Sequence, residues 1–257
     1  MSTAVDDLLD RWQLIRDGAA LCDDMLPVRT PDGTAAVLKT NARSEHEHLV
    51  LRRWAGDGAV RLLSADPHRR ALLLERLRHD DLRAVRDVEA CEVVARLYRR
   101  LHVPGMPQLP TLTSQLDEWI DDFEALPRSA SIPHRLVEQA ITSGRELSEG
   151  SSGTVVHGNL HYATVLAADR EPWLAIAPRP VNGDPHYEIA PMLWHRWDEL
   201  AGDVRGGVRR RFYTLVDAAG LDEDRARAWV VVRVVRAAVR DPARATTYVA
   251  LAKAVQD

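Results

Sequence analysis

The amino-acid sequence predicts an α+β protein built from two lobes, a small β-rich lobe over residues 1–77 and a larger α-rich lobe over residues 78–257. Two pairs of extended runs, each joined at a proline-containing turn signal, occupy the first lobe. From residue 80 onward apolar residues recur at helical spacing, apart from three short strand-like runs between residues 154 and 177. We therefore expect a hinge near Glu75-Arg76-Leu77.

The first lobe opens with a predicted helix over residues 3–16, one side of which carries Leu8, Leu9, Trp12 and Ile15. Pro31-Asp32-Gly33 then separates two alternating runs and predicts a β-hairpin. A helix is expected to begin at a cap on Ser44 and to end at Gly56. A second pair of strands is expected on either side of Asp66-Pro67.

The second lobe is predicted to contain helices over residues 82–101, 112–125 and 133–148. The runs TVVHG, TVLAA and PWLAIA interrupt the helical pattern and are predicted strands. WVVVRVVRAAVR is rich in β-branched residues, but Arg233, Arg236 and Arg240 recur at intervals of three and four, which favours a helix. The charge run over 209–211, with Arg205 one turn earlier, indicates a solvated helix face, with an acidic partner as the alternative.

Composition excludes several classes of protein. Of 257 residues, 46% are hydrophobic and 28% are charged, with a formal net charge of −4. This is enough apolar material for one large domain or two lobes, and the mixed charge predicts no nucleic-acid partner. No run of about 18 apolar residues occurs, so we expect no membrane association and a cytoplasmic location. Cys22 and Cys91 predict no disulfide framework, and Cys91 is expected to pack as a small apolar residue.

The motifs that carry a family resemblance cover most of the chain. They are LPVRTPDGTAAVLK, LRRWAGDGAVRLL, ALLLERL, LHVPGMP, VVHGNLH, REPWLAIAPRP and GDPHYEIAPMLW. In this order they resemble the antibiotic kinases of the aminoglycoside phosphotransferase superfamily, most closely its streptomycin 6-kinase and hydroxyurea phosphotransferase branch. The resemblance implies a two-lobed protein-kinase-like (aminoglycoside phosphotransferase) fold within the predicted α+β class.

The resemblance also implies roles for residues in the first lobe. Lys39 matches the ATP lysine of the family and Glu47 its helix partner, with Glu45 as an alternative partner. The alternative to nucleotide binding is a relic ion pair that holds the helix to the sheet. Family members usually carry small residues before the L-P-V strand, whereas this chain carries Asp23 and Asp24, which would repel a triphosphate.

Three positions depart from the family pattern. Members usually read H-G-D-L-H-x-x-N and I-D-P-K, where this chain reads HGNLHYAT at 157–164 and IAPR at 176–179. Asn159 therefore stands at the position of the catalytic aspartate, and Thr164 at that of a metal-binding asparagine. Ala177 stands at the position of the principal metal-binding aspartate.

The chemistry of these three residues predicts that phosphoryl transfer has been lost. An amide cannot take the proton of an attacking hydroxyl, and general-base help is typically worth about a hundred- to ten-thousand-fold. Alanine offers no oxygen to Mg²⁺. We therefore expect no cofactor and no magnesium or other metal site, and leave residual ATP binding open. Arg179 would offset phosphate charge without replacing a bridging metal.

Other residues are candidates for a new role of the same loop. His161 is a candidate acid/base, Tyr162 a hydrogen-bond donor, and Asp23 or Asp24 a carboxylate, with a packed role as the alternative for His161 and Tyr162. His157 is expected to support the loop. A metal pair of His157 with His161 lacks a third ligand in the sequence.

Candidate substrate-binding residues follow the loop. Asp184 precedes Pro185 and reads first as a helix cap, with substrate binding or the rescue of a metal site as the alternatives. Trp194 and Trp197, with Trp119 and Tyr187, are expected to line an acceptor pocket, with core packing as the alternative.

Three functions follow from these expectations. The first is a pseudokinase of secondary metabolism that binds or transforms a natural product or short peptide without phosphoryl transfer. The second is a weak ATP-dependent phosphotransferase acting on a hydroxyl of an aminoglycoside-type antibiotic. The third is a non-catalytic partner protein of a biosynthetic complex. Magnesium-dependent turnover of ATP with streptomycin separates the second function from the others.

Overall fold

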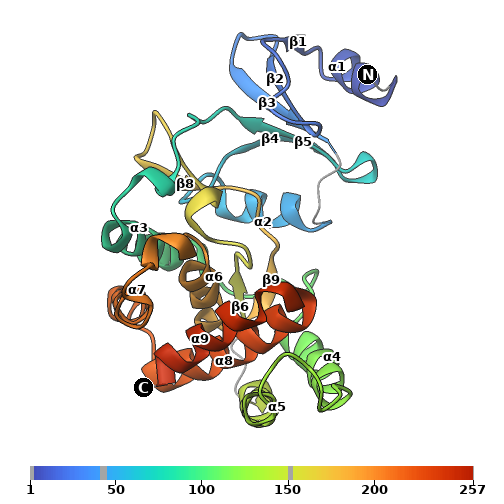
Figure 1. Cartoon of the computed structure of the whole chain (residues 1–257). Helices are drawn as coiled ribbons and strands as arrows, with labels where there is room; N and C mark the ends of the chain where they lie inside the picture. The colour runs from blue at the N-terminus through green and yellow to red at the C-terminus, as the bar shows by residue number, and fades with distance from the viewer. Residues whose placement is uncertain (1–2, 41–44, 150–152, 257) are drawn as a thin grey trace. The chain divides into compact units, whose positions relative to one another are not determined.

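The computed structural model describes residues 3–40, 45–149 and 153–256, and it divides the chain into two compact units (Figure 1). One unit comprises Met1–Asp80 and Leu166–Arg179, and the other comprises Asp81–Val165 and Pro180–Asp257. The first unit is built around a sheet and the second is mostly helical, which confirms the predicted α+β class.

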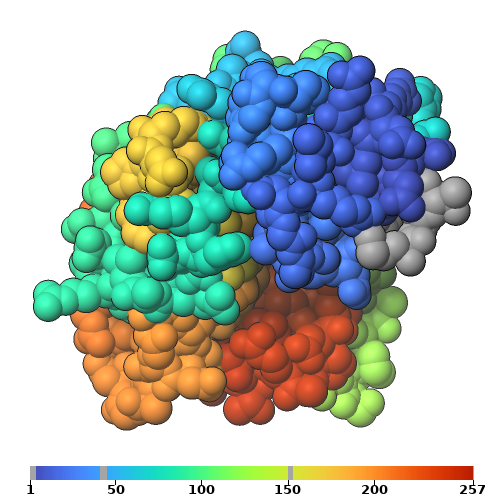
Figure 2. Space-filling model, turned by 90° about the horizontal axis from the view of Figure 1, so that it is seen from above, coloured from blue at the N-terminus to red at the C-terminus, as the bar shows by residue number. Residues whose placement is uncertain are grey.

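The first unit contains an antiparallel five-stranded sheet in the order β1-β2-β3-β5-β4. Its strands are β1 (Ile15–Arg16), β2 (Met25–Arg29), β3 (Ala35–Lys39), β4 (Leu62–Asp66) and β5 (Ala71–Glu75). Helix α1 (Thr3–Arg11) buries Leu8 and Leu9 against Val28 and Leu38 of this sheet. In Figure 2 the helix and the first strands accordingly form one continuous blue surface.

Both predicted strand pairs are present, and β2 and β3 flank the expected turn, where Gly33 has a φ of 84°. The predicted helix over 3–16 is wrong at its end. It stops at Arg11 because Gln13 adopts a left-handed φ of 52°, and Ile15 begins β1 with 68% of its surface exposed. Helix α2 (Glu47–Trp54) ends at Ala55, and the expected cap at Ser44 lies outside the described residues.

The segment Leu166–Arg179 groups with the first unit, whereas the sequence-based boundary placed it in 78–257. It contains most of the ribbon formed by β7 (Val165–Ala167) and β8 (Trp173–Ala175). The reason is hydrogen bonding. The N–H of Ala175 donates to the carbonyl of Gly58 at 2.9 Å, and the Arg170 guanidinium pairs with Glu75 at 2.6 Å.

The second unit is a helical assembly in which α3 packs on α7 and α8 packs on both α5 and α9 (Figure 1). Its helices are α3 (Asp87–Leu101), α4 (Leu112–Glu124), α5 (His134–Glu149), α6 (Ile189–Trp194), α7 (Val204–Ala219), α8 (Glu223–Arg240) and α9 (Ala245–Gln256). The Val-rich segment is therefore a helix, as the arginine spacing predicted. Cys91 is fully buried, which confirms its packing role. Along the described residues no helix is long and apolar enough to cross a membrane.

The strands β6 (Thr154–Val156) and β9 (Val181–Gly183) position the polar segments of this unit. They pair antiparallel, so that Val156 lies opposite Val181 and Thr154 opposite Gly183. A Cβ on Gly183 would lie 2.2 Å from Cδ1 of Leu112, so only glycine allows α4 to approach this closely. The loop His157–Thr164 follows β6, and Asp184 follows β9.

Candidate active site

A lysine–glutamate pair forms in the first unit. Lys39 is the last residue of β3, and its Nζ lies 2.8 and 2.7 Å from the two carboxylate oxygens of Glu47, the first residue of α2. Glu47 is 2% exposed, and burial raises its pKa while the Lys39 ammonium lowers it again in part. Glu45, the predicted alternative partner, instead pairs with Arg70 on the surface.

Asp23 and Asp24 lie in the turn between Cys22 and Met25, just before β2. Asp23 is exposed and Asp24 is half-buried. They belong to the first unit, whereas His161 and Tyr162 belong to the second, so their predicted cooperation stays a prediction.

The buried carboxylate of Glu188 holds the start of the loop over 157–164. His157 is fully buried, and Gly158 adopts a φ of 74°. The N–H of Gly158 donates to Oε1 of Glu188 at 2.6 Å, and Oε2 of Glu188 lies 2.8 Å from Nε2 of His102. The backbone directly before the half-buried Asn159 is therefore held by Glu188.

Thr164 closes the same loop on itself. Its hydroxyl accepts the N–H of His161 at 2.9 Å and lies 2.8 Å from the carbonyl oxygen of Asn159. The ring of His161 in turn accepts the N–H of Ala163, which completes a capping box around the 3₁₀ turn Tyr162–Thr164. The Thr164 hydroxyl is thus part of the loop's internal bonding.

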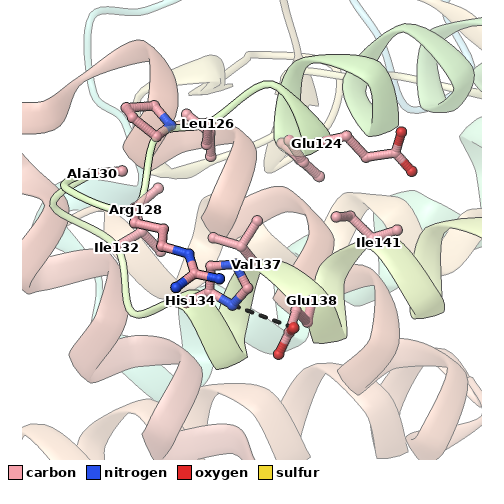
Figure 3. A pocket seen from close by; sticks show the side chains of 11 residues that line it. Glu124, Leu126, Arg128, Ala130, Ile132, His134, Val137, Glu138 and Ile141 are labelled. Carbon is pink, nitrogen blue, oxygen red and sulfur yellow. Dashed lines mark ion pairs between the residues drawn. The ribbon is translucent and has the colours of Figure 1, made fainter.

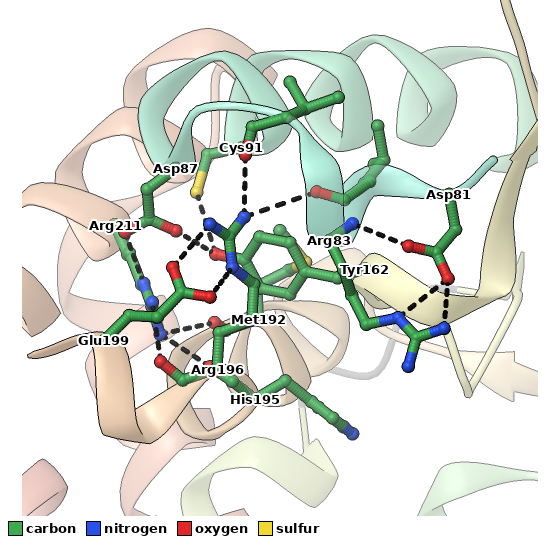
Figure 4. Close-up of polar contacts among 12 residues, drawn as sticks. Asp81, Arg83, Asp87, Cys91, Tyr162, Met192, His195, Arg196, Glu199 and Arg211 are labelled. Carbon is green, nitrogen blue, oxygen red and sulfur yellow. Dashed lines mark hydrogen bonds and ion pairs between the residues drawn. The ribbon is translucent and has the colours of Figure 1, made fainter.

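Tyr162 is buried in a polar cluster (Figure 4), so the prediction that it donates a hydrogen bond to a ligand is wrong. Its hydroxyl donates to Asp87 of α3, and burial raises its pKa far above the ordinary range. The guanidinium carbons of Arg196 and Arg211 lie 4.8 and 5.5 Å from the centre of its ring. The tyrosine anchors the loop to α3 and α7.

Arg211 lies at the centre of this cluster, and its burial there was not predicted from the sequence. It is 1% exposed, its Nε donates to Asp87 at 2.7 Å, and its Nη1 donates to the carbonyl of His195 at 2.7 Å. The prediction of a solvated arginine run is therefore wrong for this member. The helical spacing of the sequence could have predicted this burial. Arg211 follows Val208 by three residues and precedes Leu215 by four, which places it on the buried face of α7.

Asp184 caps the 3₁₀ turn Pro185–Glu188, as its sequence predicted. The carboxylate is 1% exposed and also accepts hydrogen bonds from Arg225 and from Nε1 of Trp229, the latter at 2.7 Å. Burial would raise its pKa, but hydrogen bonds from His186 and Trp229 prevail and lower it to about 2. With these partners, Asp184 is an internal anchor and does not support the predicted ligand contact.

The predicted aromatic residues separate into two groups. Tyr187 is 7% exposed and packs between Trp119 and Trp229, with ring centroids 6.4 and 5.4 Å away, so its environment is the core. Trp194 and Trp197 line one pocket of about 340 Å³. The other residues of this pocket are His195, Arg196, Asp198, Arg244 and Thr247.

A second pocket of about 230 Å³ lies where α4 passes into α5 (Figure 3). Apolar side chains such as Phe123, Ile132 and Val137 line it, with the ion pair of His134 and Glu138 at its edge. It shares no residue with the loop over 157–164, so we do not place it in the candidate active site.

The donor atoms present do not fit a protein-held Mg²⁺ ion. Ala177 has no side-chain oxygen, the Thr164 hydroxyl is bonded within its loop, and the Asp184 carboxylate is buried. Across residues 3–40, 45–149 and 153–256, no cluster of three or more His, Cys, Asp or Glu side chains has the geometry to hold a metal ion. Hard cations need several such oxygens.

The β-sheet unit, the helical unit, the strand lysine paired with a helix glutamate, and the histidine–glycine loop after β6 are features of the kinase-like fold. The chain belongs to the aminoglycoside/hydroxyurea antibiotic resistance kinase family, whose model matches residues 11–244. The predicted superfamily and branch are thereby confirmed.

Two relatives from Streptomyces and Kitasatospora support the same assignment. The chain is 39% identical to the streptomycin 6-kinase of Streptomyces glaucescens over 92% of its own length and 81% of the relative. It is 38% identical to the hydroxyurea phosphotransferase of Kitasatospora aureofaciens, over 90% of the chain and 70% of the relative. These relatives correct the prediction of a pseudokinase, because they point to an antibiotic kinase.

Solved structures share the fold at low sequence identity. Choline kinase LicA from Streptococcus pneumoniae superimposes with a TM-score of 0.64 at 7% identity, with 99% of each chain covered. A thermostable mutant of the aminoglycoside phosphotransferase APH(4)-Ia, in a ternary complex with AMP-PNP and hygromycin B, gives a TM-score of 0.62 at 16% identity. That match covers 99% of this chain and 98% of the other.

Proposed function

We propose that this protein is an ATP-dependent phosphotransferase that acts on a hydroxyl of an aminoglycoside-type antibiotic. The observation that carries the proposal is the buried pair of Lys39 and Glu47, in a chain 39% identical to a streptomycin 6-kinase. In kinase-like enzymes a strand lysine of this type holds the phosphates of ATP, and a helix glutamate keeps the lysine in position.

The amide at position 159 lowers the expected rate without excluding the reaction. Phosphoryl transfer passes through a loose transition state, so catalysis depends mostly on positioning and electrostatic stabilisation. The side chain of Asn159 can orient an acceptor hydroxyl by hydrogen bonding, although it cannot take the proton. Because general-base help is worth about a hundredfold or more, we expect a slow enzyme unless another group accepts the proton.

The pocket of Trp194 and Trp197 is our candidate for the acceptor site. Indole faces attract organic cations, and Asp198 adds a carboxylate to the same pocket. The Arg233 guanidinium already lies 5.3 Å from the centre of the Trp194 ring, so Trp197 is the indole that we propose for contact with the antibiotic. Its two arginines are already engaged, Arg196 with Glu199 and Arg244 with the ring of Tyr248. The net charge of −4 would assist the approach of a cationic antibiotic.

We propose that ATP is the cosubstrate that this site binds. We also propose that the protein works in the cytoplasm, where ATP is available. The proposal requires no partner protein, nucleic acid or membrane. The acceptor is a small natural product and not a peptide.

The test incubates the purified protein with γ-labelled ATP and either streptomycin or hydroxyurea, and follows transfer of label to the acceptor. We expect labelled streptomycin, and loss of labelling by about a hundredfold in Lys39→Ala, with partial retention in Lys39→Arg, which keeps the charge. Label on hydroxyurea alone would mean that the acceptor is hydroxyurea, as in the name of the hydroxyurea phosphotransferase, and not an aminoglycoside. Absence of label on either acceptor would overturn the proposed function.

A further inference from the structure

Two histidine rings stack beside the candidate catalytic loop. His161, which begins the 3₁₀ turn of the loop, and His195, which follows α6, have ring centroids 3.9 Å apart and planes inclined by 10°. Arg211 donates to the carbonyl of His195, so the backbone at this residue is fixed from α7. Figure 4 shows the His195 side chain directed away from the cluster around Tyr162.

The hydrogen bonds of the two rings define which nitrogen of each carries the proton. Nδ1 of His195 lies 2.7 Å from the carbonyl oxygen of Pro191, which can only accept, so Nδ1 carries hydrogen and Nε2 keeps its lone pair. That Nε2 makes no hydrogen bond to any residue the structure describes. His161 differs, because its Nδ1 lone pair already accepts the N–H of Ala163.

The surroundings keep His195 neutral. Burial is the main cause that lowers its pKa, and nearby positive charges lower it further, against a partly opposing effect of the bond to Pro191. The charged groups around it are Arg211 of α7, Arg233 of α8, Arg244 after α8, and Arg196 and Asp198 in the shared pocket. A neutral imidazole with an unused lone pair is the form that a proton acceptor needs at neutral pH.

Resting on the proposed function, we propose that Nε2 of His195 accepts the proton of the acceptor hydroxyl, the task that Asn159 cannot perform. The hydroxyl oxygen forms a bond to the γ-phosphorus of ATP while the bond from that phosphorus to the β–γ bridging oxygen breaks. ADP leaves with the electron pair, and the hydroxyl proton passes to Nε2 of His195 and then to solvent. His195 lines the same pocket as Trp194 and Trp197, which places it where the acceptor would bind.

Two other groups in this unit, Asp184 and His161, are less suited to accept the hydroxyl proton. The Asp184 carboxylate is buried among Arg225, Trp229 and His186. His161, the predicted acid/base, uses its Nδ1 lone pair within the loop, so we assign it the role of supporting the His195 ring by stacking.

The experiment compares wild type, His195→Gln and His195→Ala with ATP and streptomycin from mildly acidic to alkaline pH. Glutamine keeps a hydrogen-bonding side chain but cannot take a proton. We expect kcat to fall by about a hundredfold in His195→Gln, with little change in the KM for ATP. The acidic limb of the wild-type profile, with a midpoint below the ordinary histidine value of about 6.5, should disappear. Added imidazole should restore part of the activity of His195→Ala.

Two further variants make the result specific. Asn159→Asp supplies a carboxylate, so His195→Gln should cost less than about tenfold in that background. The exposed His134→Gln is the matched control and should behave as wild type. Equal rates and equal pH profiles for wild type and His195→Gln would overturn the assignment while leaving the kinase intact. Wild-type protein without any transfer would instead remove the proposed function, and the role of His195 with it.

Discussion

The carboxylate of Glu188 joins the loop at Gly158 to the end of α3 at His102. One oxygen accepts the N–H of Gly158 at 2.6 Å, and the other lies 2.8 Å from the His102 ring. Burial alone would raise the pKa of Glu188, but the hydrogen bond and charge of His102, with the N–H of Gly158, prevail and hold it below its ordinary value. This carboxylate is therefore charged at neutral pH, and its charge is used within the fold.

Replacement of Glu188 by Gln should lower the free energy of unfolding by about 2–3 kcal/mol at neutral pH, because hydrogen bonds to a charged group are lost. A carboxyl with a depressed pKa stabilises the fold above its unfolded pKa. The difference from wild type should therefore shrink as the pH falls through the folded pKa. Urea unfolding at several pH values measures it. The exposed Glu89→Gln should change stability by less than about 0.5 kcal/mol, and an equal loss there would contradict the prediction.

Asp184→Asn tests the second buried carboxylate. Its pKa of about 2, against an ordinary 3.8, corresponds to about 2 kcal/mol of stability. This contribution is complete above about pH 4 and is lost as the pH falls through 2. Thermal unfolding of the two proteins should thus differ at neutral pH and converge in strong acid. A difference that stays constant across this range would show that charge is not the cause.

Ala177 carries backbone strain that a substitution can reveal. Its φ of 52° lies in the left-handed region, which costs alanine about 1–2 kcal/mol and which aspartate tolerates better. Ala177→Gly should be neutral or stabilising by up to about 1 kcal/mol, whereas Ala175→Gly, in strand β8, should destabilise by about 0.5–1 kcal/mol.

Ala177→Asp should fold as well as wild type and supply the missing oxygen. We expect Mg²⁺ to increase the ATP-induced rise in melting temperature more in this variant than in wild type, because a ligand that binds the folded state raises its stability. A magnesium effect of the same size in both proteins would mean that residue 177 takes no part in metal binding.

Arg211 and Arg210 are adjacent in the sequence but differ in environment. Arg211 is buried and pairs with Asp87, so Arg211→Met should destabilise by about 3–5 kcal/mol, because Asp87 loses its cationic partner and the carbonyl of His195 loses its donor. Arg210 pairs with Asp203 on the surface, where the loss in Arg210→Met should stay below about 1 kcal/mol. Denaturant unfolding of both variants measures the difference, and similar losses would contradict the role of Arg211 as a buried anchor.

The local pattern of the sequence predicted most of the elements. The hairpin at 31–33 and the helix over the Val-rich segment followed from turn residues and from arginine spacing, which depend on neighbours in the chain. The predicted helix at the N-terminus extended too far. Its end depends on the left-handed backbone at Gln13, and glutamine is not a residue type that indicates this conformation. The lysine–glutamate pair was predicted only through the family resemblance.

By itself, the sequence determined the α+β class, the order of the elements, the family, and the identity of Asn159, Thr164 and Ala177. Tertiary structure alone decided that the charged side chains of Glu188 and Arg211 are buried, and that the ring of His195 stacks on the ring of His161. The physical reason is that helix and strand signals arise within a few residues, whereas these partners are brought together by the packing of helices and loops far apart in the chain. Burial and hydrogen bonding then set the protonation state of each group.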